Sequence, residues 1–353
     1  MTPLTDILKS LIATRGPLPL SDYMAECLFH PEHGYYATRD PLGAAGDFIT
    51  APEISQMFGE LIGLSLAQSW IDQGAPKPFT LAELGPGRGT LMADILRATR
   101  GVPGFHDAAQ IWLVEASPTL TEIQRDTLKP HVVNWTTQTA DLPNAPLFLV
   151  ANEFFDALPI RQFQRAGAGW SERVIGLEND ALTFGLTGAE PLSALAHRLA
   201  DTRDGDVVEL CPQAAPIIAQ IGARIEANGG AALLIDYGDW RSLGDTFQAL
   251  HDHAATAPLA APGTADLTAH VDFEALATAA PCAHTRLTGQ GVFLERLGIT
   301  ARAQALATKL SNDALDAHIA AHRRLTHPEE MGTLFKVLGL FPRKSAPPPG
   351  LET

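Results

Sequence analysis

The chain has 353 residues and a formal net charge of −15, from 25 basic and 40 acidic side chains. This length is enough for one large domain or two small ones, and a hydrophobic content of 46% is typical of a soluble globular protein. The acidic balance argues against a nucleic-acid-binding surface, which needs clustered lysine and arginine.

Three cysteines lie far apart and in no C-x-x-C spacing: Cys27, Cys211 and Cys282. This pattern predicts a reducing compartment and no disulfide framework. The N-terminal residues show neither the apolar core of a signal peptide nor an arginine-rich transit segment. No run approaches the roughly 20 apolar residues of a membrane helix. These features predict a cytoplasmic protein without membrane insertion.

Residues 1–75 are predicted to form an N-terminal helical segment. Apolar residues at helical spacing predict helices over 3–15 and from 53 to about 72. Ser21 is expected to cap a short helix through Cys27.

From residue 76 to 341 we expect an α/β core. Alternating strand and helix patterns predict a mostly parallel sheet with helices on both faces. The expected strands are 79–84, 111–115, 132–135, 146–152, 231–237, 285–287 and 334–340. A helix that Ser117 caps and Pro118 opens follows the second strand.

Two insertions are expected in this core, and a tail after it. Residues from about 160 to 211 look like short antiparallel strands joined by turns, with a helix through 200. Residues 241–284 begin with a long irregular stretch, for which a functional loop is expected. Residues 342–353 contain three consecutive prolines and are predicted to be a disordered tail.

The stretch 79–90 carries the strongest functional signal. An apolar strand enters a turn that contains Pro86 and three glycines at alternate positions, Gly85, Gly87 and Gly89. A helical pattern follows at once, and this arrangement is the usual cradle of a nucleotide-like cofactor. Glycine is needed because the backbone must turn sharply and approach the ligand closely. The alternative is a turn that only joins a strand to a helix.

The spacing of this stretch discriminates between cofactors. Dinucleotide sites read G-x-G-x-x-G, whereas here Glu83 stands two residues before Gly85. A carboxylate at this strand end would repel a pyrophosphate but suits a ligand with an ammonium and a sulfonium. The pattern resembles the first motif of class I S-adenosylmethionine (SAM) methyltransferases.

The other strands are expected to end at the same edge of the sheet. Glu115 ends the second strand, where an acid accepts hydrogen bonds from ribose hydroxyls; the alternative is a solvated strand-end acid. After the third strand, Asp141 and Leu142 are candidates for holding the adenine. Asp141 followed by Leu-Pro is equally good turn chemistry.

Polar side chains directly follow the fourth strand: Asn152, Glu153 and Asp156, with two phenylalanines between them. In class I methyltransferases this corner faces the transferred methyl, and carboxylates suit a cationic acceptor. Glu153 is placed to grip a guanidinium through two hydrogen bonds, and Asn152 to contact the nucleophile or the methionine moiety. The alternative is a capped helix start with Asp156 in its first turn.

Six segments together resemble the MidA family of SAM-dependent methyltransferases: 46–60, 83–90, 151–159, 235–238, 266–273 and 289–294. This family is related to a mitochondrial complex I assembly factor. The resemblance implies protein arginine N-methylation, with a complex I core subunit as the substrate of the mitochondrial members. It also implies that 46–56 folds over the cofactor, that Thr50 contacts SAM, and that Glu153 and Asp156 face the substrate arginine.

Other interpretations stay open. The chain is alternatively a SAM-binding assembly chaperone without turnover, or a methyltransferase with a different acceptor, because better-known arginine methyltransferases carry two glutamates on a longer loop. The interpretation as an NAD(P)-dependent dehydrogenase conflicts with the glycine spacing and with the carboxylate of Glu83. Late histidines and acids match no standard metal site, so we expect no metal and instead a polar network or a wall that faces the substrate: His251, His253, His270, Asp266 and Asp272.

Overall fold

The structure is a computed structural model that describes residues 2–38 and 50–353. The described residues form two compact units. The first, called the inserted unit, comprises 2–38, 156–214 and 241–272; the second, called the sheet unit, comprises 50–155, 215–240 and 273–353. The expected N-terminal segment is therefore shared, because its first helices belong to the inserted unit and its last to the sheet unit.

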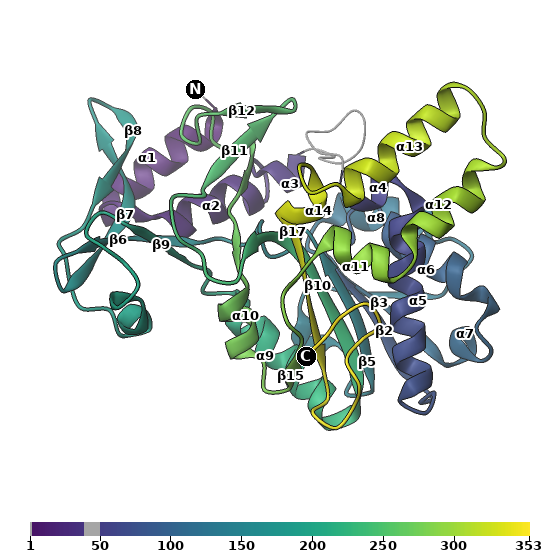
Figure 1. Cartoon of the computed structure of the whole chain (residues 1–353). Helices are drawn as coiled ribbons and strands as arrows, with labels where there is room; N and C mark the ends of the chain where they lie inside the picture. The colour runs from purple at the N-terminus through teal and green to yellow at the C-terminus, as the bar shows by residue number, and fades with distance from the viewer. Residues whose placement is uncertain (1, 39–49) are drawn as a thin grey trace. The chain divides into compact units, whose positions relative to one another are not determined.

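The sheet unit is built on a mostly parallel sheet with the strand order β4-β3-β2-β5-β10-β17-β15 (Figure 1). The strands are β2 (Phe79–Leu84), β3 (Ala109–Val114), β4 (Val133–Thr136), β5 (Leu147–Asn152), β10 (Gly230–Asp239), β15 (Ala283–His284), β16 (Thr288–Gly289) and β17 (Phe335–Phe341). Strands β4 to β10 pair in parallel, whereas β17 runs antiparallel to β10. The predicted α/β fold class is confirmed.

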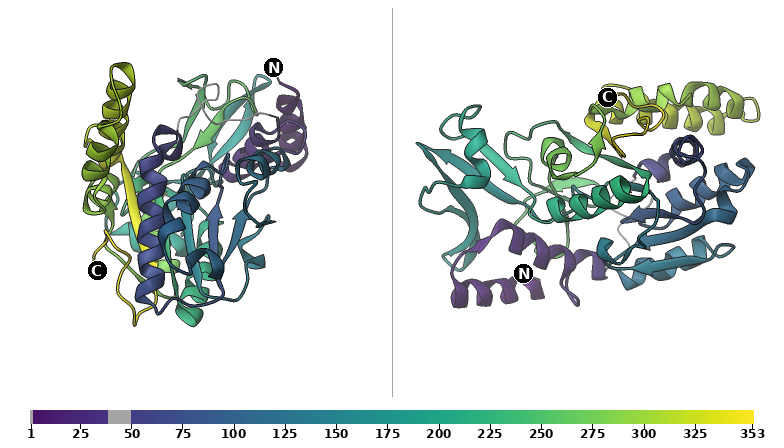
Figure 2. Two further views of the ribbon diagram at one scale, coloured as in Figure 1. Left: turned by 90° about the vertical axis from the view of Figure 1, so that its right-hand side faces the viewer. Right: turned by 90° about the horizontal axis from the view of Figure 1, so that it is seen from below.

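The helices of the sheet unit lie around this sheet. They are α4 (Ala51–Ile54), α5 (Gln56–Asp72), α6 (Thr90–Ala98), α7 (Phe105–Ala108), α8 (Pro118–Thr127), α9 (Ala214–Asn228), α10 (Phe273–Ala279), α11 (Gln290–Arg296), α12 (Ile299–Ala307), α13 (Asp313–Thr326) and α14 (Met331–Leu334). Some of them, such as α13, pack on other helices. Figure 2 shows α5 lying along the sheet. Ser117 caps α8 by accepting a 3.3 Å hydrogen bond from Leu120 N, as predicted. None of the helices in 2–38 and 50–353 is long and apolar enough to cross a bilayer.

Two glycines bring α5 close to α6, the helix that follows the glycine turn. A Cβ at Gly59 would lie 2.6 Å from the Cβ of Asp94, and one at Gly63 would lie 2.9 Å from the Cα of Ile95. Both distances are below any ordinary contact, so a side chain at either position would push the helices apart. The position of α6 relative to the sheet therefore depends on these glycines.

A buried carboxylate joins three helices of the sheet unit. Glu60 on α5, with its side chain 5% exposed, accepts hydrogen bonds from Arg97 on α6 (2.6 Å) and from Arg302 on α12 (2.7 Å). Burial would raise the pKa of Glu60, but the hydrogen bonds from Arg302 and Arg97 outweigh it and lower the pKa. The carboxylate is thus held in its charged form.

We expect Glu60→Gln to lower the free energy of unfolding by about 1–3 kcal/mol at neutral pH, because two arginines lose a charged acceptor. Urea unfolding measures this loss. A folded-state pKa that is lowered gives stability that is present above the ordinary glutamate pKa and lost as the pH falls, so the difference should shrink in acid. The control is Glu122→Gln on α8, whose side chain is 77% exposed; it should change stability by less than about 0.5 kcal/mol. If the two variants changed stability equally, Glu60 would not be the charged acceptor that joins the three helices.

The inserted unit contains two small antiparallel sheets and the first helices. One sheet has the order β1-β7-β6-β9 with β8 paired to β7, and the other the order β12-β11-β13. The elements are α1 (Pro3–Arg15), β1 (Leu18–Pro19), α2 (Leu20–Phe29), α3 (Tyr35–Thr38), β6 (Arg161–Ala166), β7 (Gly169–Glu178), β8 (Ala181–Leu186), β9 (Val207–Leu210), β11 (Gln248–His251), β12 (Ala254–Thr256), β13 (Asp266–Thr268) and β14 (Val271–Asp272). One apolar cluster joins α1 and α2 to both sheets, so three separate chain segments share a core.

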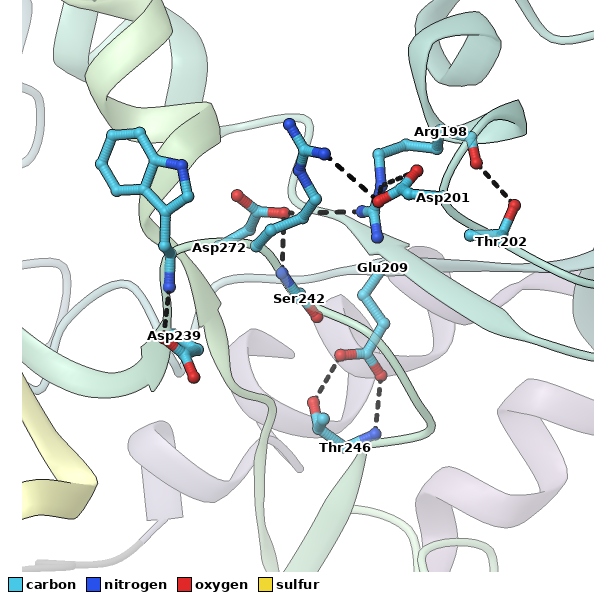
Figure 3. A network of polar contacts seen from close by, with 10 residues as sticks. Arg198, Asp201, Thr202, Glu209, Asp239, Ser242, Thr246 and Asp272 are labelled. Carbon is cyan, nitrogen blue, oxygen red and sulfur yellow. Dashed lines mark hydrogen bonds and ion pairs between the residues drawn. The ribbon is translucent and has the colours of Figure 1, made fainter.

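Polar contacts also hold the two insertions together (Figure 3). Arg198, only 2% exposed, pairs with Asp201 at 3.0 Å and with Asp272 at 4.0 Å. The buried Glu209 accepts a 3.0 Å hydrogen bond from Thr246 N and another from the Thr246 hydroxyl. Asp272 therefore belongs to a polar network, and the residues described contain no cluster of ligands suited to a metal ion.

Several expectations about local structure are wrong. The 241–284 insertion does not begin with a long irregular stretch, because β11 and β12 lie in it and form a small sheet with β13. The helix expected through 200 is a 3-10 helix, Ser193–Leu199. Residues 285–287 form no strand but lie between β15 and β16. The helix expected from 53 to 72 is broken at Ser55, whose hydroxyl caps α5 by accepting from Met57 N at 3.2 Å.

The C-terminal residues are not a disordered tail. Leu351 is 6% exposed and packs in the main core cluster of the sheet unit. The Ser65 hydroxyl donates to Pro349 O at 2.9 Å, and Arg286 N donates to Glu352 O at 2.7 Å. The prolines limit the conformations of the unfolded segment, and the apolar end supplies the buried area that pays for ordering it.

Candidate cofactor and substrate site

The glycine turn after β2 adopts the conformation that its sequence requires. Gly85, Gly87 and Gly89 have φ values of +58°, +53° and +81°, a region that residues with a Cβ rarely adopt. Gly89 N donates to Pro86 O at 2.8 Å, which closes the turn, and Gly89 is the N-cap of α6. The backbone thus passes directly from the strand into the helix N-terminus.

Space is restricted beside the first glycine. A Cβ at Gly85 would lie 3.0 Å from Cδ2 of Phe154, a residue of the loop after β5. Gly85 N also donates to Val114 O at the end of β3, at 3.0 Å. The turn is therefore in contact with the chain that leaves two neighbouring strands.

Glu83 lies buried at the end of β2. Its residue is 3% exposed, and its Oε2 has no hydrogen-bond partner among the described residues. Burial, with a smaller contribution from the charge of Glu115, raises the pKa of Glu83 to about 8. Side chains alternate along a strand, so Glu83 shares the face of Leu81, which packs in the core cluster with α5 and α6.

Glu115 follows β3 and is held by two donors. Oε1 accepts from Ser117 N at 2.8 Å, and Oε2 accepts from the Gln124 side chain at 3.0 Å. Burial raises the pKa of Glu115, and these hydrogen bonds act against that shift. Glu115 is therefore not the freely solvated acid of the alternative interpretation.

In the turn after β4 the predicted acid is exposed, unlike Glu115 after β3. Asp141 is exposed and accepts a 2.7 Å hydrogen bond from the Thr136 hydroxyl. Leu142 is 3% exposed, and Arg224 donates to the backbone carbonyls of Ala140 (2.7 Å) and Leu142 (3.2 Å). The Asp141 carboxylate thus takes part in the turn chemistry that was the alternative to an adenine contact.

Asn152 and Glu153 stand where β5 ends. Glu153 has a φ of +51°, which is strained for a residue with a side chain. Its Oε1 accepts from Asn152 Nδ2 and from Ala51 N, both at 3.1 Å. Asn152 is 8% exposed, and its Oδ1 has no hydrogen-bond partner among the described residues.

Asp236 on β10, not predicted as a site residue, holds this strained loop. Its Oδ2 accepts from Phe154 N (3.2 Å) and Phe155 N (2.9 Å), and Glu153 N donates to the neighbouring Ile235 O (2.9 Å). The carboxylate is 1% exposed. Asp236 lies three residues before the end of β10, so the rule that pointed to Glu83 and Glu115, an acid at the carboxyl end of a core strand, points to this region as well.

Helix α4 connects Thr50 to this corner. Thr50 is the N-cap of α4, and its carbonyl accepts from Glu53 N at 2.9 Å. The Glu53 carboxylate accepts a 2.5 Å hydrogen bond from the Thr90 hydroxyl at the start of α6. Of the segment 46–56 expected to cover the cofactor, residues 46–49 lie outside the described residues.

Asp156 belongs to the inserted unit and is described there. Its carbonyl accepts from Ala269 N at 3.0 Å. Its charge is one of the causes, after burial and Asp266, that raise the pKa of Tyr36. The other predicted site residues belong to the sheet unit, whereas Asp156 belongs to the inserted unit.

Comparison with known proteins decides the family. A family model described as "Putative S-adenosyl-L-methionine-dependent methyltransferase" matches residues 61–291, well over half of the chain. The chain belongs to this methyltransferase family. The predicted family, the class I-like fold and the SAM cofactor are confirmed, and the chain is a SAM-dependent methyltransferase.

Relatives of this methyltransferase are similar to it over most of their length. "Protein arginine methyltransferase NDUFAF7, mitochondrial" of Homo sapiens is 38% identical over 97% of this chain and 85% of its own. The Xenopus laevis protein of that name is 39% identical over 94% of this chain and 82% of its own. A crystal structure of a COG1565 superfamily member from Burkholderia thailandensis, bound to S-adenosyl-homocysteine, superposes with a TM-score of 0.82 at 29% identity, over 97% and 92% of the two chains.

The predicted cytoplasmic location is wrong. The curated relatives are named as mitochondrial proteins, and this finding contradicts the prediction. The prediction relied on the spacing of the three cysteines, on the first residues and on the absence of a long apolar run.

The residues of the methyltransferase fit SAM. Glu83 Oε2 and Asn152 Oδ1 are buried acceptors with no hydrogen-bond partner among the described residues. Such atoms are costly unless a ligand supplies donors, and the ammonium of SAM has three. The glycine turn leaves a backbone surface without side chains, which suits close approach.

Proposed function

We propose that this methyltransferase transfers a methyl group from SAM to an arginine side chain of a protein. The observation that carries the proposal is the carboxylate of Glu153, held by two donors at the end of β5. SAM supplies a methyl bonded to a sulfonium, already a good electrophile. The enzyme therefore has mainly to align a nucleophile and exclude water.

We assign the cofactor to the carboxyl ends of β2, β3 and β4. Glu83 receives the ammonium, Glu115 the ribose hydroxyls, and the turn after β4 the adenine. The residues proposed to contact SAM are Thr50, Glu83, Gly85, Pro86, Gly87, Gly89, Glu115, Asp141 and Leu142. Support comes from the unpartnered buried oxygen of Glu83 and from the positive φ of the glycines.

We assign the acceptor to the corner after β5. Glu153 binds two nitrogens of the guanidinium, which concentrates the positive charge there and leaves more lone-pair character on the third. Asn152 orients the nucleophile or the methionine moiety, and Asp156 is the third residue that we assign to the substrate arginine. The names of the relatives support arginine as the acceptor.

A subunit of respiratory complex I is the protein substrate that we propose. The resemblance to the MidA family supports this assignment, and net charge −15 favours a substrate segment that is basic. The test incubates the purified chain with deuterated SAM and isolated complex I core subunits, followed by peptide mass spectrometry. A labelled methyl on arginine is the expected result. Label on another residue type would point to a different acceptor, and SAM binding without any label would favour an assembly chaperone.

The raised pKa of Glu83 predicts pH-dependent cofactor binding. Below about pH 8 the ligand-free carboxyl holds a proton, and binding an ammonium must release it. We expect the affinity for S-adenosylhomocysteine to rise with pH by up to about tenfold per unit between about pH 6 and 8, then to level off. Calorimetry in buffers of different ionisation enthalpy measures both the affinity and the released proton.

The control for this prediction is Glu83→Gln, which should bind more weakly at pH 8 but with no pH dependence in this range. The pH dependence of folding stability in the unliganded protein has the opposite sign to that of cofactor affinity. Because the folded-state pKa is raised, Glu83 stabilises the fold below its ordinary pKa, and this contribution is lost as the pH rises through about 8. An affinity that falls with rising pH would contradict the prediction.

A further inference from the structure

We propose that Gln124 is a positioning residue that fixes the ribose-binding carboxylate and the glycine turn in one arrangement. The proposal rests on the assignment of Glu115 to the ribose. Gln124 lies on α8, the helix between β3 and β4, and is fully buried. Its side chain is thus a polar amide inside the sheet unit, where each of its hydrogen-bonding groups needs a partner.

All three partners of this amide are defined. Nε2 donates to Gly87 O at 2.8 Å and to Glu115 Oε2 at 3.0 Å, while Oε1 accepts from Trp135 Nε1 at 2.9 Å. An indole nitrogen is only a donor, so it must face the oxygen of the amide. The Trp135 contact therefore determines that the nitrogen of Gln124 points to Gly87 and Glu115.

The bond to Glu115 restricts rotation of the carboxylate. Gln124 holds Oε2, and Ser117 N holds Oε1 at 2.8 Å. A carboxylate has about four acceptor sites, so these two bonds orient it and still leave acceptor capacity for hydroxyls. Without Gln124 nothing from α8 holds Oε2, so the carboxylate is less ordered and part of the binding free energy is lost in ordering it.

The bond to Gly87 O ties the same amide to the glycine turn. Gly87 has a φ of +53° and is the middle glycine of the three. A Cβ at the next glycine, Gly89, would lie 3.6 Å from Cγ of Gln124, so the side chain also packs against the turn. One residue thus links the two parts of the cofactor site that come from β2 and β3.

The experiment measures ribose selectivity. Calorimetry gives the Kd of S-adenosylhomocysteine and of its 2′,3′-dideoxyribose analogue for the wild type, Gln124→Met and Leu120→Ala. Methionine keeps the volume of glutamine but makes none of the three hydrogen bonds. Leu120, on the same face of α8 and 4% exposed, is the control for a general loss of packing.

We expect Gln124→Met to weaken S-adenosylhomocysteine binding by about tenfold to a hundredfold, as for hydrogen bonds to a charged group. The preference for the ligand with both hydroxyls should be lost as well. Leu120→Ala should lower the Tm and keep both the affinity and the preference. Because Gln124→Met is at risk of misfolding, Trp135→Phe, which frees the amide to flip, is the second variant and should lose part of the preference.

Two results overturn the proposal. If both Gln124→Met and Trp135→Phe keep the hydroxyl preference within about twofold, or if Leu120→Ala loses it equally, Gln124 has only a structural role. If the wild type itself has no preference, the assignment of Glu115 fails and this inference fails with it. Failure of arginine methylation is a separate outcome, because ribose selectivity is measured without an acceptor.

Discussion

Valine in place of Gly85 is expected to abolish binding of S-adenosylhomocysteine while the fold of the chain is retained. A β-branched residue at φ +58° is strained, and its Cβ would lie 3.0 Å from the Phe154 ring. The ring must shift and take the loop after β5 with it, and the valine methyls occupy the surface that faces the ligand. We expect the Kd to rise by more than about a hundredfold, as two or more bound groups are displaced.

Gly167 provides a matched control for this variant. It has a φ of +59°, in the turn between β6 and β7, and nothing lies within 4 Å of a Cβ built on it. Gly167→Val should therefore suffer a similar backbone strain of about 1–3 kcal/mol and keep the wild-type Kd. Thermal unfolding of both variants measures the cost of backbone strain, and calorimetry measures the loss of ligand binding. Micromolar affinity retained by Gly85→Val would mean that the ligand is held elsewhere.

Glu153→Gln is expected to reduce kcat by about a hundredfold to a thousandfold with little change in cofactor affinity. The amide oxygen of glutamine can still accept from Ala51 N and Asn152 Nδ2, which Glu153 Oε1 does at 3.1 Å. The charge that would draw the guanidinium is lost, and a charged partner removed from such a site costs several kcal/mol of transition-state stabilisation. The measurements are methyl transfer to an arginine-containing protein and the Kd of S-adenosylhomocysteine.

Glu122→Gln serves as the neutral change for comparison, because its carboxylate lies on the exposed face of α8. It should leave kcat unchanged. If Glu153→Gln retains most of the activity, the acceptor is gripped by other residues. If instead it loses cofactor binding and activity together, Glu153 acts on the cofactor rather than on the arginine.

The parts of the site that were predictable from the sequence are local along the chain. Glu83 and the three glycines fall within seven residues, so the strand, turn and helix could be seen in one window. Glu115 followed from the rule that ligands bind at strand ends. Gln124 was not predicted because its partner Gly87 lies 37 residues earlier, a distance at which no local pattern operates. Its signal was a polar residue in an apolar stripe, between Leu120 and Leu128.

The division of the chain into two units could also not be predicted from the sequence pattern. The first helices, the two insertions and their small sheets share one core, which includes Leu8, Ile175 and Leu267. Each segment alone shows only a short apolar pattern, and nothing in that pattern says which segments pair. The buried C-terminus was missed for a related reason, since its prolines were more visible than the single leucine that anchors it.

The contacts of β10 have a consequence for the order in which the protein matures during synthesis. The corner after β5 receives its shape from Ile235 and Asp236, which lie more than 80 residues further along the chain. The ribosome therefore completes the glycine turn long before the acceptor corner can settle. A nascent chain that has emerged only as far as β9 has no partner for the Phe154 and Phe155 amides, so competence for catalysis arises late in translation.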